Sequence, residues 1–143
     1  MHDKKAVMPD EAPAIRTIAM PADTNPNGDI FGGWLMSQMD LAAGNVAARR
    51  ARGRAATVAV EAITFLSPVA VGDEVSLFAR VLSVGRTSMR IEVEAWRRAR
   101  AGEETRKVTE AIFTFVAIDE SGRSRPIPPE REPAIAPAVA VSE

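Results

Sequence analysis

The stretch NPNGDIFGGWLMSQMDLAAG (25–44) passes from a turn-forming segment into a long amphipathic helix, and it is the part of the chain that decides the fold. Its first half is rich in Asn, Gly, Asp and Pro, a composition typical of loops. Apolar residues then recur at spacings of four, three and four, which predicts a helix over about 33–52, with Gly53 able to cap it. The recurring residues are Leu35, Met39, Ala42 and Val46.

Outside this stretch, alternation of apolar and polar residues predicts strands. The later strands are long and adjacent, so we expect a largely antiparallel meander. The order is one strand, a Gly-rich loop, one long helix and then four strands, and a single helix can cover only one face of such a sheet. The uncovered face and edges are therefore predicted to favour self-association. The predicted strands cover residues 14–20, 57–66, 74–84, 89–96 and 108–119.

The chain divides into one domain with two flanking segments. Residues 1–13 are polar and are predicted to be a flexible N-terminal lead, and residues 14–125 form the predicted domain. Residues 126–143 hold five of the ten prolines, so this tail is predicted to be extended or disordered. Within the domain, the charged segment 97–107 is predicted to connect two strands.

Composition excludes several kinds of partner. The formal net charge of -1 provides no overall positive field for nucleic acid. No apolar run approaches the roughly 20 residues that span a bilayer, and the N-terminus lacks the apolar segment of a signal peptide. Cysteine is absent. These features predict a cytoplasmic protein with no disulfide, no nucleic-acid partner and no membrane segment.

The residue types that the chain lacks limit the catalytic mechanisms and metal sites that it can support. The chain has no Cys and no Tyr, and its one His is His2. This excludes Ser-His-Asp and Cys-His catalysis, and it argues against a zinc site, so no metal ligand is predicted. Any acid–base chemistry falls to Asp, Glu or Lys, supported by Asn, Ser, Thr and backbone N–H groups.

Asp40 is the first candidate site residue. In a helix it lies on a face of small and apolar residues, beside Met36, Ala43 and Gly44. A carboxylate on such a face is costly unless it is hydrogen-bonded, paired or used. The pattern alone also allows a structural Asp that is bonded to a nearby loop or directed to solvent.

The loop before the helix is the second candidate. Asn25 precedes the helix, and Gly32 and Gly33 lie at its start, where unpaired N–H groups and the positive end of the dipole suit a developing oxyanion. An ordinary turn with a helix cap would show the same residue types. No dinucleotide fingerprint or P-loop spacing is present.

The turn Gly85-Arg86-Thr87-Ser88 is the third candidate. It offers one guanidinium, two hydroxyls and the N–H groups of a turn, which together suit a phosphate. An ordinary hairpin turn has the same composition. The residues by themselves leave both interpretations open.

Together these residues resemble the YciA-like acyl-CoA thioesterases, a group within the hotdog-fold acyl-CoA hydrolases. The run TIAMPADTNPNGDIFGGWLMSQMDLAAG (17–44) carries the resemblance, and its NPNGDIFGGWLMSQMD part is very specific. The resemblance covers about residues 14–128. It continues through VEAITFLSPVAVGDEV (60–75), VLSVGRTSMRIEVEAW (81–96) and TEAIFTFVAIDESGRSRPIP (109–128).

The resemblance implies an α+β hotdog fold, with a long central helix wrapped by an antiparallel sheet, and homodimers assembled into trimers of dimers. It implies hydrolysis of acyl-CoA to free CoA and a carboxylic acid, with Asp40 as general base or nucleophile and Asn25 from the partner protomer. On this interpretation, a backbone N–H near Gly32 or Gly33 holds the oxyanion. The CoA phosphates would lie at the turn 85–88. Coenzyme A is part of the substrate, so no separate cofactor is implied.

Two other functions share these features. A hotdog dehydratase or hydratase would act on similar thioesters, but such enzymes rely on a His with a carboxylate, and His2 is badly placed. A non-catalytic acyl-CoA-binding or sensing module would keep the pocket without turnover. Asp40 argues against this module, because binding a neutral acyl chain gains nothing from a buried carboxylate.

Overall fold

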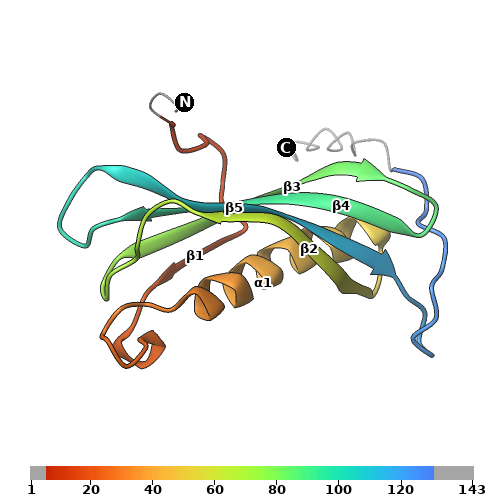
Figure 1. Cartoon of the computed structure of the whole chain (residues 1–143). Coiled ribbons are helices and arrows are strands. Elements are labelled where there is room, and N and C mark those ends of the chain that lie inside the picture. The colour runs from red at the N-terminus through yellow and green to blue at the C-terminus, as the bar shows by residue number, and fades with distance from the viewer. Residues whose placement is uncertain (1–5, 131–143) are drawn as a thin grey trace, which may run out of the picture.

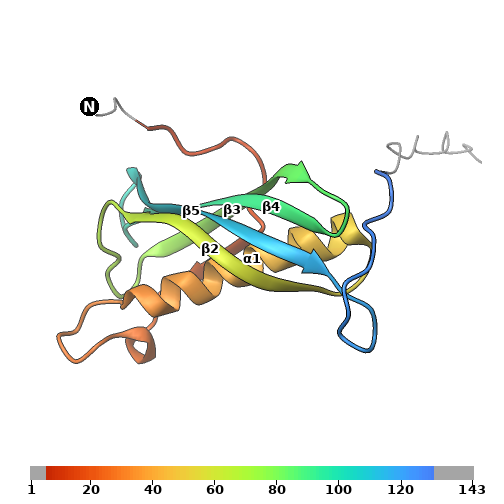
Figure 2. The same cartoon turned by 45° about the vertical axis from the view of Figure 1, so that its right-hand side comes forward.

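One long helix lies along one face of a five-stranded sheet in the computed structural model, which describes residues 6–130 (Figure 1). Helix α1 spans Gly32–Ala51, within one residue of the prediction at each end. The turned view in Figure 2 shows the helix on one side of the sheet only. This arrangement confirms the α+β hotdog fold that the resemblance implies. No helix among the described residues is long and apolar enough to cross a membrane. The buried face of α1 supplies Leu35, Met39, Ala42, Ala43, Ala47 and Ala51 to the core.

The C-terminal end of α1 differs from the prediction. Arg52, and not Gly53, adopts the left-handed conformation that ends the helix, with φ 53° and ψ 49°. The N–H of Gly53 donates to the Ala48 carbonyl, 3.1 Å away. A Cβ at Gly53 would lie 2.5 Å from Nη2 of Arg125. Glycine at this position therefore allows the close approach of Arg125.

Five strands form one antiparallel sheet: β1 (Ile15–Ile18), β2 (Ala55–Phe65), β3 (Glu74–Val84), β4 (Ser88–Arg98) and β5 (Thr105–Ala117). Their order across the sheet is β1-β3-β4-β5-β2. The predicted meander holds for β3, β4 and β5. Strand β2 instead crosses over to pair with β5, so it does not lie beside its neighbour in sequence.

The charged segment predicted as a connection is mostly strand. Strand β4 continues to Arg98 and β5 begins at Thr105, so only residues 99–104 connect them. Charged side chains are tolerated there because they pair across or along the sheet. Nε of Arg98 lies 3.4 Å from Oε1 of Glu74, for example. The prediction of a connection over 97–107 is therefore wrong at both of its ends.

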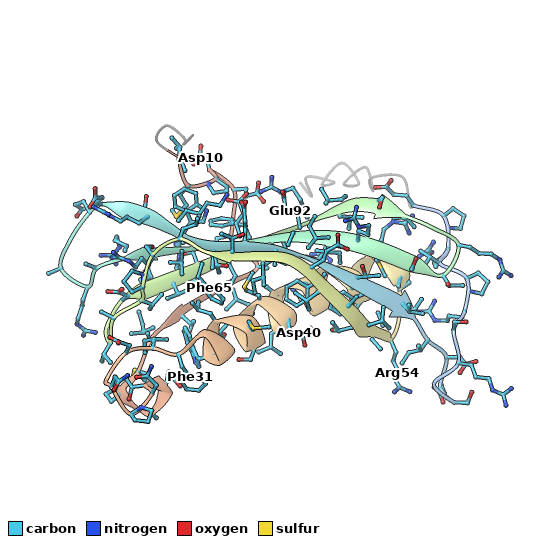
Figure 3. The ribbon with its side chains drawn as sticks, viewed as in Figure 1. Asp10, Phe31, Asp40, Arg54, Phe65 and Glu92 are labelled. Atoms are coloured by element: carbon cyan, nitrogen blue, oxygen red, sulfur yellow. The ribbon has the colours of Figure 1, made fainter. Side chains whose placement is uncertain are left out.

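The alternation in β4 separates the two faces of the sheet. Met89 and Ile91 are buried in the core beside α1. Glu92 and Glu94 point the other way and lie 3.5 and 3.0 Å from the Arg80 guanidinium. Figure 3 shows Glu92 on the side of the sheet away from the helix. The helix therefore packs on the apolar face, and ion pairs cross the other face.

The outer edge of β2 is an uncovered apolar feature near the helix. This strand pairs with β5 on one side and with no described strand on the other. Its side chains Val58, Val60 and Phe65 are 59%, 37% and 49% exposed, and Leu41 of α1 is 59% exposed. An open strand edge with apolar side chains is a ready site for pairing with a second chain.

The first residues of the Pro-rich tail lie against the end of the molecule where α1 stops. The N–H of Ile127 donates to the Arg86 carbonyl at 2.8 Å, and two arginines of the helix end donate to tail carbonyl groups. The tail is therefore attached over residues 126–130. Residues 131–143 lie outside the described part of the chain, as do residues 1–5 with His2.

Candidate active site

Asp40 lies on α1 where the helix faces β2 (Figure 3). Its Oδ1 accepts a hydrogen bond from Oγ1 of Thr57 at 2.5 Å, and the residue is half-buried. The predicted small-residue face is present, since Ala43 and Ala47 are fully buried beside it. The Oδ2 atom accepts no hydrogen bond from the described residues. The carboxylate is thus held by one oxygen and can act on a ligand with the other.

Thr57 is a site residue that the sequence analysis missed. It lies 17 positions after Asp40, and no spacing rule connects a residue of a helix with one of a later strand. The one sequence feature that could have pointed to Thr57 is the composition of its strand. Thr57 and Glu61 are the only polar residues in the stretch AATVAVEAI (55–63). A lone hydroxyl in such a stretch is a weak indication that it has a partner.

Asn25 begins a tight loop, and its side chain holds that loop together. Oδ1 accepts hydrogen bonds from the N–H groups of Asn27 and Asp29, at 2.9 and 3.1 Å. Gly28, with φ 86°, makes the turn. Because both partners are N–H donors, the side-chain oxygen faces the loop and the NH2 group faces away from it. Asn25 therefore offers a hydrogen-bond donor to a ligand.

The N-terminal end of α1 lacks a side-chain cap. Phe31 occupies the N-cap position without a side-chain hydrogen bond, and the first turn has no acidic residue. Among the described residues, no acceptor is found for the N–H groups of Gly32 and Gly33. A Cβ at Gly32 would lie 3.3 Å from Cζ of Phe65, so glycine lets this ring rest on the backbone. Open N–H groups at the positive end of a helix suit an oxyanion.

An apolar hollow of about 480 Å³ lies beside these N–H groups, between the start of α1 and the segment that follows β2. Its size and lining suit an apolar chain attached to a polar group. Gly32 lies at its wall, so a carbonyl group at the mouth could face the open end of the helix. The apolar side chains that line it are Ile30, Leu35, Phe65, Leu66, Pro68 and Val69.

The two parts of the candidate site are separated within one chain. Asp40 lies seven residues after Gly33, which corresponds to about 11 Å along an α-helix. A carbonyl oxygen hydrogen-bonded to Gly33 is therefore out of reach of Asp40 in the same chain. No hydrogen bond between described residues joins Asn25 to Asp40. A carbonyl that contacts both groups would need them from two different chains.

The predicted phosphate turn lies at the opposite end of the molecule from the start of α1 (Figure 1). The N–H of Gly85 donates to the Ser88 carbonyl at 2.7 Å, and the Thr87 carbonyl accepts from the N–H of Ala117 at 2.9 Å. Arg86 is exposed and pairs with no described carboxylate. Backbone hydrogen bonds therefore hold the turn, and its guanidinium has no carboxylate partner among residues 6–130.

The chain is similar to proteins whose names describe one activity. A family model described as the thioesterase superfamily matches residues 27–102. An uncharacterized acyl-CoA thioester hydrolase of Zymomonas mobilis is 57% identical over 130 residues, which are 91% of this chain and 87% of that protein. The acyl-CoA thioester hydrolase YciA of Escherichia coli K12 is 53% identical over 119 residues, which are 81% of this chain and 90% of that protein.

A solved structure of a thioesterase is also similar to this chain. The hexameric thioesterase y2039 from Yersinia pestis has a TM-score of 0.81 and 49% sequence identity, and the match covers 85% of this chain and 99% of that chain. The similarity therefore extends over most of this chain. The chain belongs to the thioesterase superfamily and, within it, to the YciA-like acyl-CoA thioester hydrolases.

Proposed function

We propose that this protein hydrolyses acyl-CoA to free CoA and a carboxylic acid in a site shared by two protomers. Asp40 of one protomer is the general base or nucleophile, and Asn25 comes from the other protomer together with the N–H groups of Gly32 and Gly33. The observation that carries the shared site is the separation of about 11 Å along the helix between Gly33 and Asp40 of one chain. A thioester carbonyl can contact both only across two chains.

The class of reaction follows from family membership, since the relatives are acyl-CoA thioester hydrolases. The residue types of this chain fit that reaction. CoA leaves as a thiolate, which is a good leaving group, so the reaction needs a base or nucleophile and oxyanion donors but no strong general acid. A chain without Cys or Tyr can supply these groups from Asp, Asn and backbone N–H.

The open edge of β2 supports the pairing of two chains. Two such edges related by a two-fold axis would continue the antiparallel sheet and cover Val58 and Val60. They would also bring the two α1 helices close together, because Asp40 faces Thr57 on this strand. The thioesterase of Yersinia pestis is a hexamer, and three dimers make a hexamer. We therefore propose a homodimer as the unit, assembled into a trimer of dimers.

The residues divide the chemistry between binding and proton transfer. The acyl chain occupies the apolar hollow next to Gly32, which turns the thioester carbonyl toward the open N–H groups. The NH2 group of Asn25 donates a further hydrogen bond as negative charge develops on that oxygen. Asp40 takes a proton from the attacking water, or it attacks the carbonyl carbon to form an anhydride that water cleaves. In both cases the C–S bond breaks and CoA leaves as the thiolate.

Release of free CoA from a series of acyl-CoA substrates tests this function. We expect steady-state thiol release that depends on the length of the acyl chain, because the hollow has a limited volume. A binding or sensing module would bind acyl-CoA without releasing thiol. A dehydratase or hydratase would change the acyl group and leave the thioester intact. Tight binding without thiol release above background would contradict the proposal.

Replacing Arg86 by Glu is expected to raise KM for acyl-CoA about tenfold or more and to change kcat little. The CoA phosphates do not change during the reaction, so a contact with them contributes equally to the ground state and the transition state. An acyl-pantetheine substrate without these phosphates should be hydrolysed as by the wild type. The matched control is Arg100→Glu, which makes the same charge change in the connection between β4 and β5. If Arg86→Glu raised KM equally for acyl-CoA and for acyl-pantetheine, Arg86 would make no contact with the phosphates.

A further inference from the structure

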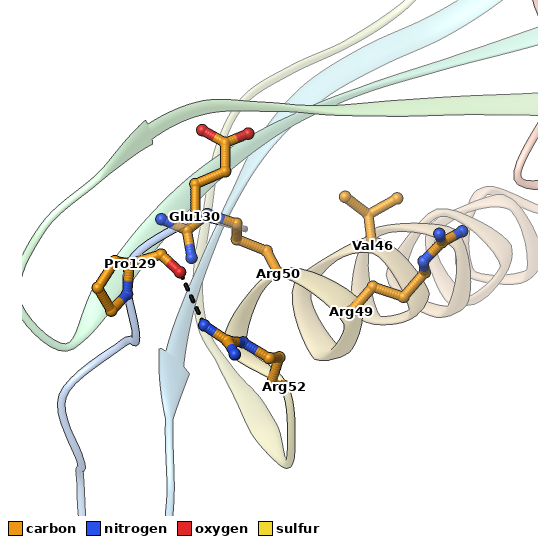
Figure 4. Close-up of a pocket in the computed structure, with 6 residues that line it drawn as sticks. All are labelled: Val46, Arg49, Arg50, Arg52, Pro129 and Glu130. Atoms are coloured by element: carbon orange, nitrogen blue, oxygen red, sulfur yellow. Dashed lines mark hydrogen bonds between the residues drawn. The ribbon is translucent and has the colours of Figure 1, made fainter. Parts of the chain in front are cut away.

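Two hollows lie at opposite ends of α1, and their linings differ. The hollow at the C-terminal end, of about 500 Å³, is lined largely by charged side chains, as Figure 4 shows. Its charged residues are Arg49, Arg50, Arg52 and Glu130. The hollow at the start of α1, of about 480 Å³, is lined mainly by apolar side chains. An acyl chain gains free energy by leaving water for apolar surroundings, so the hollow at the start of α1 is the one that suits it.

The wall of the apolar hollow is held to β5 by hydrogen bonds from behind. The N–H of Leu66 donates to the Val108 carbonyl at 2.6 Å, which fixes the chain just after β2. Ser67 has the one polar side chain among the residues that line the hollow. Its Oγ donates to the Lys107 carbonyl at 3.0 Å. The polar group of the lining is therefore satisfied within the protein, and what remains for a ligand is apolar surface.

The side chains of the lining form an inner wall and an outer wall. Ile30, Leu35 and Val69 form the inner wall and are buried in the core. Phe65 and Leu66 form the outer wall and are each about half exposed. A buried side chain has already left water, whereas an exposed apolar side chain gains free energy when a ligand covers it. The outer wall therefore has more to gain from an acyl chain than the inner wall.

Two phenyl rings rest on the two glycines that present open N–H groups. A Cβ at Gly32 would lie 3.3 Å from Cζ of Phe65, and a Cβ at Gly33 would lie 3.2 Å from Cε2 of Phe31. Figure 3 shows Phe65 on the sheet side of the start of α1 and Phe31 on the loop side. The rings are similarly exposed, at 49% and 42%. They differ in one respect, which is that Phe65 lines the apolar hollow and Phe31 does not.

Phe65 lies beside the position proposed for the thioester carbonyl. An N–H group of Gly32 or Gly33 would hold the carbonyl oxygen at about 2.9 Å. The ring that rests on Gly32 then lies within contact distance of the first carbons of the acyl chain, those next to the carbonyl. The chain thus passes the ring of Phe65 as it enters the hollow.

The proposed pairing of two chains also places Phe65 at the reacting group. Phe65 is the last residue of β2, and Thr57 lies near the beginning of this strand. Two antiparallel β2 strands related by a two-fold axis near their middle place the end of one strand opposite the beginning of the other. Phe65 then lies near Thr57 of the partner subunit, to which the carboxylate of Asp40 is bonded.

We propose that Phe65 is a specificity-determining residue, a role that rests on the acyl-CoA hydrolysis proposed above. Its ring covers the first carbons of the acyl chain and gives the enzyme a preference for acyl groups longer than acetyl. An acetyl group ends in a single methyl group, which leaves most of the ring exposed. A hexanoyl chain runs across the ring and covers it, so its transition state gains an apolar contact that acetyl lacks.

The ratio of kcat/KM for hexanoyl-CoA to kcat/KM for acetyl-CoA measures this preference. Phe65→Ala is expected to lower the ratio about tenfold, which corresponds to the loss of roughly 55 Å² of apolar contact. The CoA part is the same in both substrates, so any effect on its binding cancels in the ratio. The matched control is Phe31→Ala, which removes the ring on Gly33 and should leave the ratio unchanged. An unchanged ratio in Phe65→Ala, or an equal fall in Phe31→Ala, would overturn the proposal.

Phe65→Leu serves as a second variant if Phe65→Ala lowers stability. Leu keeps an apolar side chain at the end of β2 but has no ring to rest on Gly32. The ratio should then fall about fourfold, the effect of roughly one buried methylene group. A folded Phe65→Leu enzyme with the wild-type ratio would likewise show that Phe65 does not set the preference.

Calorimetric titration with oxohexyl-CoA and oxopropyl-CoA separates this role from turnover, because these thioethers keep a carbonyl group but cannot be hydrolysed. We expect Phe65→Ala to raise the Kd for the longer compound about tenfold more than the Kd for the shorter one. Hydrolysis by the wild type with equal ratios in all variants would refute the role of Phe65 alone. A length-dependent loss of binding in Phe65→Ala, without thiol release by the wild type, would refute the proposed function alone.

Discussion

Replacing Asp40 by Ala is expected to lower kcat for acyl-CoA hydrolysis by about 10²-fold or more and to leave KM close to the wild-type value. A positioned acid–base group contributes a rate enhancement of that order. Asp40 acts on the attacking water or on the reacting carbonyl, while the CoA nucleotide is bound elsewhere, so the loss should fall on the chemical step. Steady-state CoA release and single-turnover kinetics measure both quantities.

Asp40→Asn tests the chemical role of the carboxylate separately from its hydrogen bond. Its amide oxygen can still accept the hydrogen bond from Thr57, but the group can neither take a proton nor attack a carbonyl. The matched control is Glu103→Gln, which removes an exposed carboxylate in the connection between β4 and β5 and should keep full activity. Near-normal turnover by a folded Asp40→Asn enzyme would show that another residue performs the chemistry.

The second large effect is expected for Asn25→Asp, which should lower kcat by about 10²-fold, the typical loss for one oxyanion donor. An Asp at this position can still accept hydrogen bonds from the N–H groups of Asn27 and Asp29, so the loop is retained. It has no NH2 group, however, and it places a negative charge near the developing oxyanion. Steady-state CoA release by the purified variant measures the loss.

Asn27→Asp provides the control for this prediction. Asn27 belongs to the same loop and is exposed, and its side chain makes no hydrogen bond with the described residues. The substitution makes the same chemical change two residues away, and the enzyme should stay active. If Asn25→Asp retained wild-type kcat, the side-chain NH2 group would have no part in the reaction, and the backbone N–H groups alone would hold the oxyanion.

Local periodicity was sufficient to predict the elements on which the site residues lie. The spacing of Leu35, Met39 and Ala42 predicted α1 to within one residue at each end and placed Asp40 on the small-residue face. The alternation over 74–84 predicted β3 with its observed bounds. These elements are defined by their own periodicity because one face of each is packed against the core.

Long-range pairing could not be predicted in this way. No local pattern places β2 at the sheet edge beside β5, yet this position brings Thr57 to Asp40. The hydrogen bond from Arg50 to the tail joins residues 78 positions apart, so composition showed only a Pro-rich tail. The same limit explains the error at 97–107, where pairing across the sheet keeps charged residues in strands.

The shared site is the central claim, and it is tested most directly by mixing two inactive variants. Asn25→Asp and Asp40→Asn homodimers should each be nearly inactive. When the two are unfolded together and refolded at equal concentration, random pairing makes about half of the dimers mixed. In a mixed dimer, one site carries both substitutions and the other carries neither.

We predict that the refolded mixture recovers about a quarter of wild-type CoA release, because about half of the dimers then hold one intact site out of two, and the sites act independently. If each site drew both residues from one chain, every site would keep one substitution. The mixture would then stay as inactive as its parents. No recovery, with mixed dimers identified by native mass spectrometry, would contradict a site built from two chains.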